Sequence, residues 1–261
     1  MKHETPSSLK SFRFQRWVAI IGILLFLIKL AAWHLTNSDA VFSDALESIV
    51  NIIAAFMGLY SLYLAAKPKD PDHPYGHGKV EFVTSGVEGA LIIFAGVLIL
   101  VESVDSLLHG NPLEKLDYGI FLIAFTALLN YLLGYISVQR GKKENSLVLL
   151  SSGKHLQSDT WTTVGVVVSL ALVHLTGIRW IDSVVALLFG GYIITVGYKI
   201  IRTALGGIMD EADFEMLNEL AYYLEKERKK EWVDLHNVRI QQHGSKLHLD
   251  AHLTLPYYYS L

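Results

Sequence analysis

Two titratable side chains stand inside an apolar stretch that is long enough to cross a membrane. The segment SSGKHLQSDTWTTVGVVVSLALV, residues 151–173, contains His155 and Asp159. Residues four apart lie on one face of a helix, one turn from each other. A carboxylate in the middle of a membrane costs about 2.5–3.5 kcal/mol on insertion scales. We therefore expect Asp159 to have a partner on another helix.

A second apolar segment offers that partner. The stretch SDALESIVNIIAAF, residues 43–56, places Glu47 and Asn51 at the same four-residue spacing. Two helices that each present such a pair can surround one divalent cation with four nitrogen and oxygen ligands. A tetrahedral site of this kind suits zinc and also accepts iron(II), manganese, cobalt or cadmium. The alternative is a set of hydrogen bonds between helices, but two pairs at matched spacing favour the metal site.

A third group of potential ligands lies in a short loop. The segment KPKDPDHPYGHGKVE, residues 67–81, contains Asp70, His73 and His77, and its prolines and glycines favour turns. Two imidazoles four residues apart, with a carboxylate three residues before the first, can bind a divalent metal. From the residues alone, an ordinary polar connection is an equal alternative.

The last segment of this kind is SKLHLDAHLTL, residues 245–255, in which polar and apolar residues alternate as in a strand. His248, Asp250 and His252 therefore share one face, with His236 and His243 nearby in the sequence. A metal ion could bind to this face. From the residues alone we favour a solvated polar face, because histidine is common on such surfaces.

The elements that carry these residues are mostly membrane-crossing helices. The chain has 261 residues, of which 52% are hydrophobic, and a span needs about 20 mostly apolar residues. Because lipid offers no partner to backbone groups, the spans should be α-helices. Glu88 lies within the third span, where we expect it to be buried against another helix. We predict an all-α membrane bundle of six transmembrane helices at residues 17–36, 41–66, 80–108, 118–138, 147–176 and 180–201.

Charge and composition limit the orientation and the partners. The strongly basic connections all fall on one side of the predicted bundle, which places that side and both termini in the cytoplasm. The chain contains no cysteine, so disulfides and thiolate metal sites are excluded. We expect the lipid bilayer as a partner and no nucleic acid, although the net charge of −3 argues neither way.

The composition changes after about residue 206. The stretch DEADFEMLNELAYYLEKERKKEW, residues 210–232, has apolar residues at helical spacing among many charges, which is typical of a soluble amphipathic helix. Two strands joined by a turn at HGSK follow it. We therefore predict a six-helix transmembrane domain at residues 1–205 and a small cytoplasmic α+β domain at residues 206–261.

The motifs SDALESIVN, HPYGHGKVE and HLQSDTWTTVGV resemble those of the cation diffusion facilitators, and the resemblance extends from about residue 14 to residue 255. Members of this family are antiporters that exchange divalent metal ions for protons. The resemblance implies six membrane helices, a cytoplasmic C-terminal domain and a homodimer.

By the same resemblance, the transport site consists of Glu47, Asn51, His155 and Asp159. The second-helix pair departs from the usual family pattern, in which His, Asp or Asn is followed by Asp. Three oxygen ligands and one nitrogen make a harder site than two histidines and two aspartates would. Zinc remains the first choice of ion, but the harder ligand set raises the expected preference for iron(II) and manganese. Because Asn51 cannot take up a proton, proton coupling would fall on the other three residues.

The resemblance also assigns roles to the loop. It supports a metal site formed by Asp70, His73 and His77. It further matches Lys79 to a lysine that interlocks with an aspartate at the start of the cytoplasmic domain, and Asp210 stands at the place of that aspartate.

In the tail, we expect a cytoplasmic metal site at His248 and His252. Of the two, His252 matches a family ligand that lies between dimerised cytoplasmic domains. The family's domain has the order α-β-β-α-β, and this sequence supplies only α-β-β. We therefore expect an incomplete domain, either naturally shortened or truncated.

Taken together, the residues predict a transporter in the plasma (inner) membrane that exports a divalent cation, zinc first, by proton antiport. We expect no enzymatic activity. An intramembrane metalloprotease would need a motif such as HExxH, which the sequence lacks. The alternative is a membrane sensor or scaffold that binds metal without transporting it, and the altered second-helix pair and short tail are the arguments for it.

Overall fold

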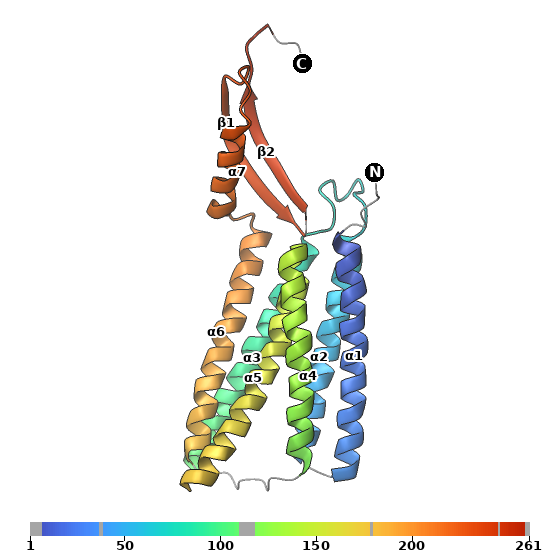
Figure 1. Cartoon of the computed structure of the whole chain (residues 1–261), viewed down its shortest axis with the longest axis vertical. Coiled ribbons are helices and arrows are strands. Elements are labelled where there is room, and N and C mark those ends of the chain that lie inside the picture. Colours follow the sequence, from blue (N-terminus) through green and yellow to red (C-terminus); the bar gives the residue numbers. More distant parts are fainter. Residues whose placement is uncertain (1–6, 37–38, 110–117, 178–179, 245, 259–261) are drawn as a thin grey trace.

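Six long helices form one bundle, and a small domain of one helix and two strands stands at one end of it (Figure 1). The computed structural model describes residues 7–36, 39–109, 118–177, 180–244 and 246–258. Within these ranges the side chains of some helical residues, Glu47 among them, are outside the described set. The helices of the bundle are α1 Ser7–Thr36, α2 Asp39–Ala65, α3 Val80–His109, α4 Tyr118–Glu144, α5 Leu147–Thr176 and α6 Trp180–Ile208.

The six predicted helices are confirmed, and three of them differ from the prediction at one end. Helix α1 begins at Ser7 rather than at residue 17, α4 continues to Glu144, and α6 continues to Ile208. In each case polar or small residues prolong the helix, and hydropathy detects only the apolar part. Within the described part of the chain, three helical stretches are long and apolar enough to cross a membrane by length and composition: Lys10–Ala31, Val80–Leu108 and Ser183–Ile208.

The outer surface of the bundle is apolar. Trp17 on α1 is 63% exposed, Phe94 on α3 is 61% exposed and Leu188 on α6 is 70% exposed. In water, so large an apolar surface would mark an interaction site or an aggregation hazard. These exposed side chains therefore support a membrane environment, and the core of the fold is the interior between the helices.

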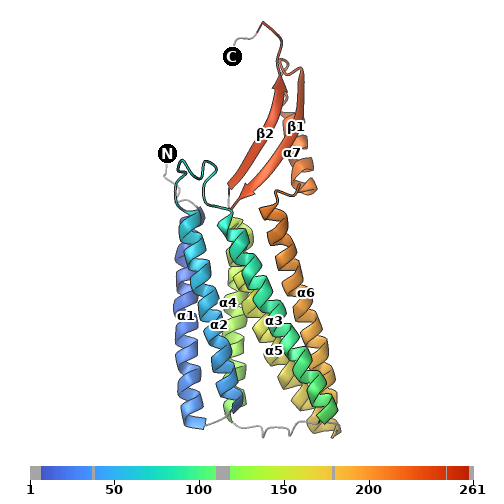
Figure 2. The same cartoon turned by 180° about the vertical axis from the view of Figure 1, so that it is seen from behind.

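Glycines bring neighbouring helices close together. Helix α3 lies along α6, and α4 lies along α5 (Figure 2). A Cβ atom at Gly197 of α6 would stand 2.8 Å from the carbonyl oxygen of Gly89 and 3.0 Å from the backbone nitrogen of Ile93, both on α3. Membrane helices associate through such close packing because lipid provides no hydrophobic driving force between them.

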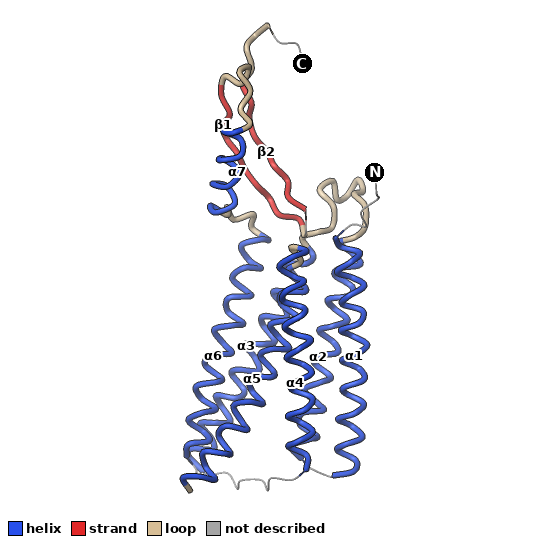
Figure 3. Tube along the Cα trace, viewed as in Figure 1, coloured by secondary structure: helices blue, strands red, loops and turns tan. Residues whose placement is uncertain are grey.

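The C-terminal domain has the predicted α-β-β order (Figure 3). Its elements are α7 Phe214–Lys226, β1 Asp234–His243 and β2 Lys246–Thr254. Asp213 caps α7, since its side chain accepts a hydrogen bond from the backbone nitrogen of Met216. The predicted turn between the strands contains Gly244, whose φ is 62°, while Ser245 lies outside the described residues.

Strands β1 and β2 pair antiparallel with one irregularity. His236 stands opposite His252, and Gln241 stands opposite His248. Between His236 and Arg239 the register shifts, as it does at a β-bulge. This shift sets His236 opposite His252.

The glycine contact between α3 and α6 makes a prediction about stability. Replacing Gly197 by alanine should lower the midpoint of thermal unfolding in detergent, because the new methyl group meets the backbone of α3; overpacking of this kind costs about 1–3 kcal/mol. Gly191, on the same helix, is the matched control, since a Cβ atom there has nothing within 4 Å. Equal shifts in Gly197→Ala and Gly191→Ala would contradict the packing argument.

Candidate metal-transport site

Asn51 and Asp159 meet between α2 and α5. The Nδ2 atom of Asn51 donates a hydrogen bond to Oδ2 of Asp159 at 2.7 Å. His155, one turn before Asp159 on α5, is 6% exposed. Glu47 lies one turn before Asn51 on α2, and its side chain is outside the described residues. The structure thus brings Asn51 of one predicted pair into contact with Asp159 of the other.

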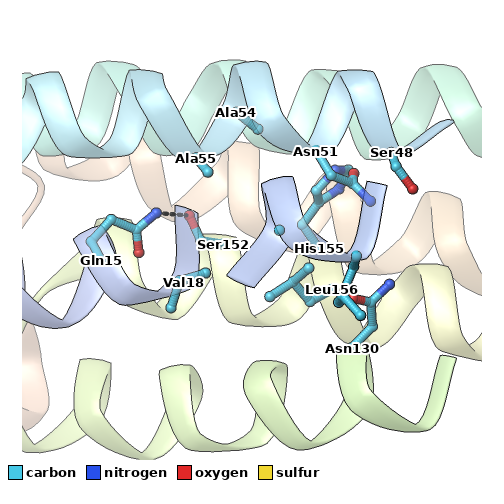
Figure 4. Close-up of a pocket in the computed structure, with 12 residues that line it drawn as sticks. Gln15, Val18, Ser48, Asn51, Ala54, Ala55, Asn130, Ser152, His155 and Leu156 are labelled. Atoms are coloured by element: carbon cyan, nitrogen blue, oxygen red, sulfur yellow. Dashed lines mark hydrogen bonds between the residues drawn. The ribbon is translucent and has the colours of Figure 1, made fainter. Parts of the chain in front are cut away.

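A cavity inside the bundle opens beside these residues (Figure 4). Figure 4 shows Asn51 and Ser48 of α2 and His155 of α5 at one end of it, and Gln15 of α1 and Ser152 of α5 at the other. The Oδ1 atom of Asn51 is buried and has no hydrogen-bond partner among the described residues. This oxygen is therefore available to a cation that enters the cavity.

A buried lysine near the cavity was missed by the sequence analysis. Lys29 of α1 is 4% exposed, and its Nζ atom donates a hydrogen bond to Oγ of Ser48 at 2.9 Å. A charged side chain inside a membrane bundle is costly and usually functional. The signal was present in the sequence, because Lys29 interrupts the apolar run GILLFLIKLAAW.

The predicted burial of Glu88 against another helix is confirmed, and the neighbour is α5. Glu88 of α3 is 1% exposed. Its Oε1 atom accepts a hydrogen bond from Oγ of Ser152 at 2.6 Å. Ser152 lines the cavity and stands one turn before His155. The carboxyl group of Glu88 is therefore hydrogen-bonded to Ser152 in the wall of the cavity that Asn51 and His155 also line.

The three predicted loop residues form a compact cluster. The Oδ1 atom of Asp70 lies 2.8 Å from Nδ1 of His73, and its Oδ2 atom lies 3.3 Å from Nε2 of His77. One potential ligand atom from each residue lies within 4.8 Å of the others. The pKa of Asp70 is lowered, chiefly by the hydrogen bond with His73. The carboxylate is therefore charged at neutral pH, and the cluster presents the donor types that a divalent ion such as zinc requires.

The predicted interlock residues are in contact. The Nζ atom of Lys79 lies 2.7 Å from Oδ2 of Asp210. Lys79 immediately precedes α3, and Asp210 follows α6. This ion pair therefore joins the ends of two helices at the point where the bundle meets the C-terminal domain.

The hairpin histidines sort into two separate pairs. The ring of His252 lies 5.4 Å from that of His236, and the ring of His248 lies 4.8 Å from that of His243. His248 and His252 are four residues apart on one strand, a distance of about 13 Å. The structure does not bring the two predicted tail ligands to a common point.

The pKa of His243 is lowered, first because the ring is buried. The neighbouring His248, Lys79 and Lys69 lower it further, and Asp210 acts in the opposite direction. The imidazole of His243 is therefore neutral at pH 7.

The described helices form a bundle with an apolar outer surface and a cavity lined partly by polar side chains, which is consistent with a membrane transporter. A family model described as the cation efflux transmembrane domain matches residues 16–209. The chain belongs to this family, the cation diffusion facilitators, whose members are transporters.

Several curated proteins are similar to the chain over most of its length. An uncharacterized transporter of Synechocystis is 36% identical over 231 residues, which cover 88% of this chain and 74% of that protein. The manganese efflux system protein MneP of Bacillus subtilis is 24% identical, with 93% of this chain and 84% of that protein covered. The cation-efflux pump FieF of Shewanella oneidensis is 27% identical, with 90% and 78% covered.

The loop cluster makes a prediction about metal binding. Asp70→Ala should remove one bound zinc ion per chain, measured by equilibrium dialysis of the purified full chain, because it deletes the carboxylate that lies between the two imidazoles. Asp72→Ala is the matched control, since Asp72 is an exposed carboxylate of the same loop outside the cluster. An unchanged number of bound zinc ions in Asp70→Ala would refute the prediction of a metal site in the loop.

Proposed function

We propose that this chain exports a divalent cation by exchange for protons, with Glu47, Asn51, His155 and Asp159 as the transport site. The observation that carries the proposal is the contact of 2.7 Å between Asn51 of α2 and Asp159 of α5. It lies beside a buried imidazole and a cavity within the bundle. Groups that can bind metal would not be placed there for stability alone, because burying them in a membrane costs free energy.

Zinc is our first choice of ion, and manganese is the main competitor. A site of one imidazole and three oxygen ligands is harder than one with two imidazoles, which favours manganese and iron(II) relative to zinc. The names of two relatives, the manganese efflux proteins MneP and MneS of Bacillus subtilis, support manganese. Cobalt and cadmium are further candidates for the same ligands.

Metal and protons compete for these ligands. Binding requires a neutral imidazole and ionised carboxylates, so an arriving ion displaces protons. Histidine suits this exchange, because its ordinary pKa of about 6.5 lies near the working pH on both sides of a membrane. Asn51 carries no proton, so His155, Glu47 and Asp159 would accept the protons that release the ion.

Asn51 must change its contact when metal arrives. In the structure, its Nδ2 atom donates a hydrogen bond to Oδ2 of Asp159. Only the Oδ1 atom of an amide can coordinate a cation, and this atom is buried without a hydrogen-bond partner in the described part of the chain. Binding would therefore replace the hydrogen bond between Asn51 and Asp159 by two bonds to the ion.

The remaining features complete the proposal. The basic loops support a cytoplasmic location for both termini, and the transporter would work as a homodimer in the plasma (inner) membrane. The pair of Lys79 and Asp210 would hold the transmembrane domain, residues 1–205, to the C-terminal domain, residues 206–261. His252 would take part in a metal site between the C-terminal domains of two protomers.

The test is metal flux into proteoliposomes under an imposed pH gradient, with zinc, iron(II), manganese, cobalt and cadmium. Flux of the preferred ion should depend on the gradient. In Asp159→Ala it should fall more than about a hundredfold, since even changes to outer-shell residues alter metal affinity about 10–100-fold. The variant should still fold, and Asp72→Ala should transport normally.

Normal flux in Asp159→Ala would refute the site assignment. Metal binding with no flux of any ion in the unaltered chain would instead favour a sensor or scaffold that does not transport.

The asparagine makes a prediction about selectivity. Asn51→Asp should raise the ratio of zinc flux to manganese flux about tenfold, because it restores an acidic residue at a position where Asp is usual in the family. The same variant adds a group that can take up a proton. An unchanged ratio in competitive flux measurements would count against the role of Asn51 as a ligand.

A further inference from the structure

Three rings from two distant segments meet where the bundle joins the C-terminal domain. The rings of His243 and His248 lie 4.8 Å apart at an angle of 80°, and that of Tyr75 lies 5.6 Å from each of them. His243 ends β1 and His248 is on β2, whereas Tyr75 comes from the loop between α2 and α3. The cluster is separate from the loop residues Asp70, His73 and His77, and from the pair formed by His236 and His252.

Three of the four ring nitrogens of His243 and His248 are buried without a hydrogen-bond partner among the described residues. His243 is 8% exposed. Among the described residues, neither of its ring nitrogens has a hydrogen-bond partner, and neither does Nε2 of His248. Buried polar atoms without partners are uncommon, and each one requires an explanation such as an ion. Ring packing alone would leave these three nitrogens unexplained.

The spacing of the rings suits a shared ion. Zinc binds imidazole nitrogen at about 2.0–2.1 Å, and two imidazoles at a tetrahedral angle then have centroids about 5 Å apart. The observed separation is 4.8 Å. Histidine is a preferred ligand of zinc, cobalt, nickel and copper(II), and the neutral His243 has a free lone pair.

The charges around His243 are mixed. Lys69 and Lys79 face it and oppose a cation. Lys79 is neutralised by Asp210 at 2.7 Å. The other oxygen of that carboxylate, Oδ1, is buried without a hydrogen-bond partner in the described part of the chain, and Asp210 also interacts electrostatically with His243. The pair of Lys79 and Asp210 therefore contributes no net charge, and Lys69 is the remaining charge near His243 that opposes a cation.

The position of the pair is fixed by backbone contacts. A Cβ atom at Gly78 would stand 2.3 Å from the carbonyl carbon of His243 and 2.7 Å from the backbone nitrogen of Gly244. Only glycine permits this approach, so the loop and the hairpin turn are in direct contact. We propose that His243 and His248 bind a divalent cation of the zinc or cobalt class at this junction, in a site distinct from the loop cluster and from the transport site.

The test is a count of bound zinc and cobalt in the purified full chain, by equilibrium dialysis. His243→Gln and His248→Gln should each lose the same single ion, and the double variant should lose no more than either one. The matched control is His34→Gln, which alters an exposed histidine in the last turn of α1, outside every proposed site, and should leave the count unchanged. Correct folding is checked by the midpoint of thermal unfolding.

Three outcomes would overturn the proposal. These are an unchanged count in both single variants, the loss of two ions in the double variant, and the loss of an ion in His34→Gln. If His243→Gln fails to fold, His248→Gln decides the question alone, because His248 is only partly buried. The assay measures binding, so its result does not depend on whether the chain transports metal.

Discussion

The constraint on which the site depends is the cost of a carboxylate within a membrane. Asp159 can stand in α5 only if other groups compensate its charge. In the structure, the amide of Asn51 supplies a hydrogen bond at 2.7 Å. This hydrogen bond joins α2 to α5. The need of Asp159 for a polar partner therefore constrains how these two helices lie relative to each other. The close glycine contacts of α3 with α6 build the rigid support beside them.

Asparagine at position 51 changes the acid–base chemistry of the site. Two aspartates at this distance could not both be ionised, and the pair would have to share a proton. An amide donates a hydrogen bond to the carboxyl group of Asp159 without itself taking up a proton. In the proposed transport site, fewer protons would therefore be exchanged per ion than with a second aspartate at position 51.

Sequence spacing was sufficient where the ligands lie on one element or one short loop. The four-residue spacing predicted that His155 and Asp159 lie on one face of a helix, and the density of histidine and aspartate predicted the cluster of Asp70, His73 and His77 that the structure shows. Sequence spacing could not predict contacts that depend on how a helix is rotated about its own axis. The bond from Ser152 to Glu88 is of this second kind, since the interface between α3 and α5 decides it. The contact of His248 with His243 depends in the same way on the register of the hairpin, which sets Gln241 opposite His248.

Three consecutive residues connect the loop to the rest of the protein. His77 contacts Asp70 within the loop, Gly78 contacts the hairpin backbone at His243, and Lys79 pairs with Asp210 after α6. The side chain at position 78 must be absent, and the charge at position 79 must be positive. A change in the geometry of the loop therefore acts on both the hairpin and the end of α6. Metal ions bound on either side of Gly78 would stiffen one continuous contact rather than two independent ones.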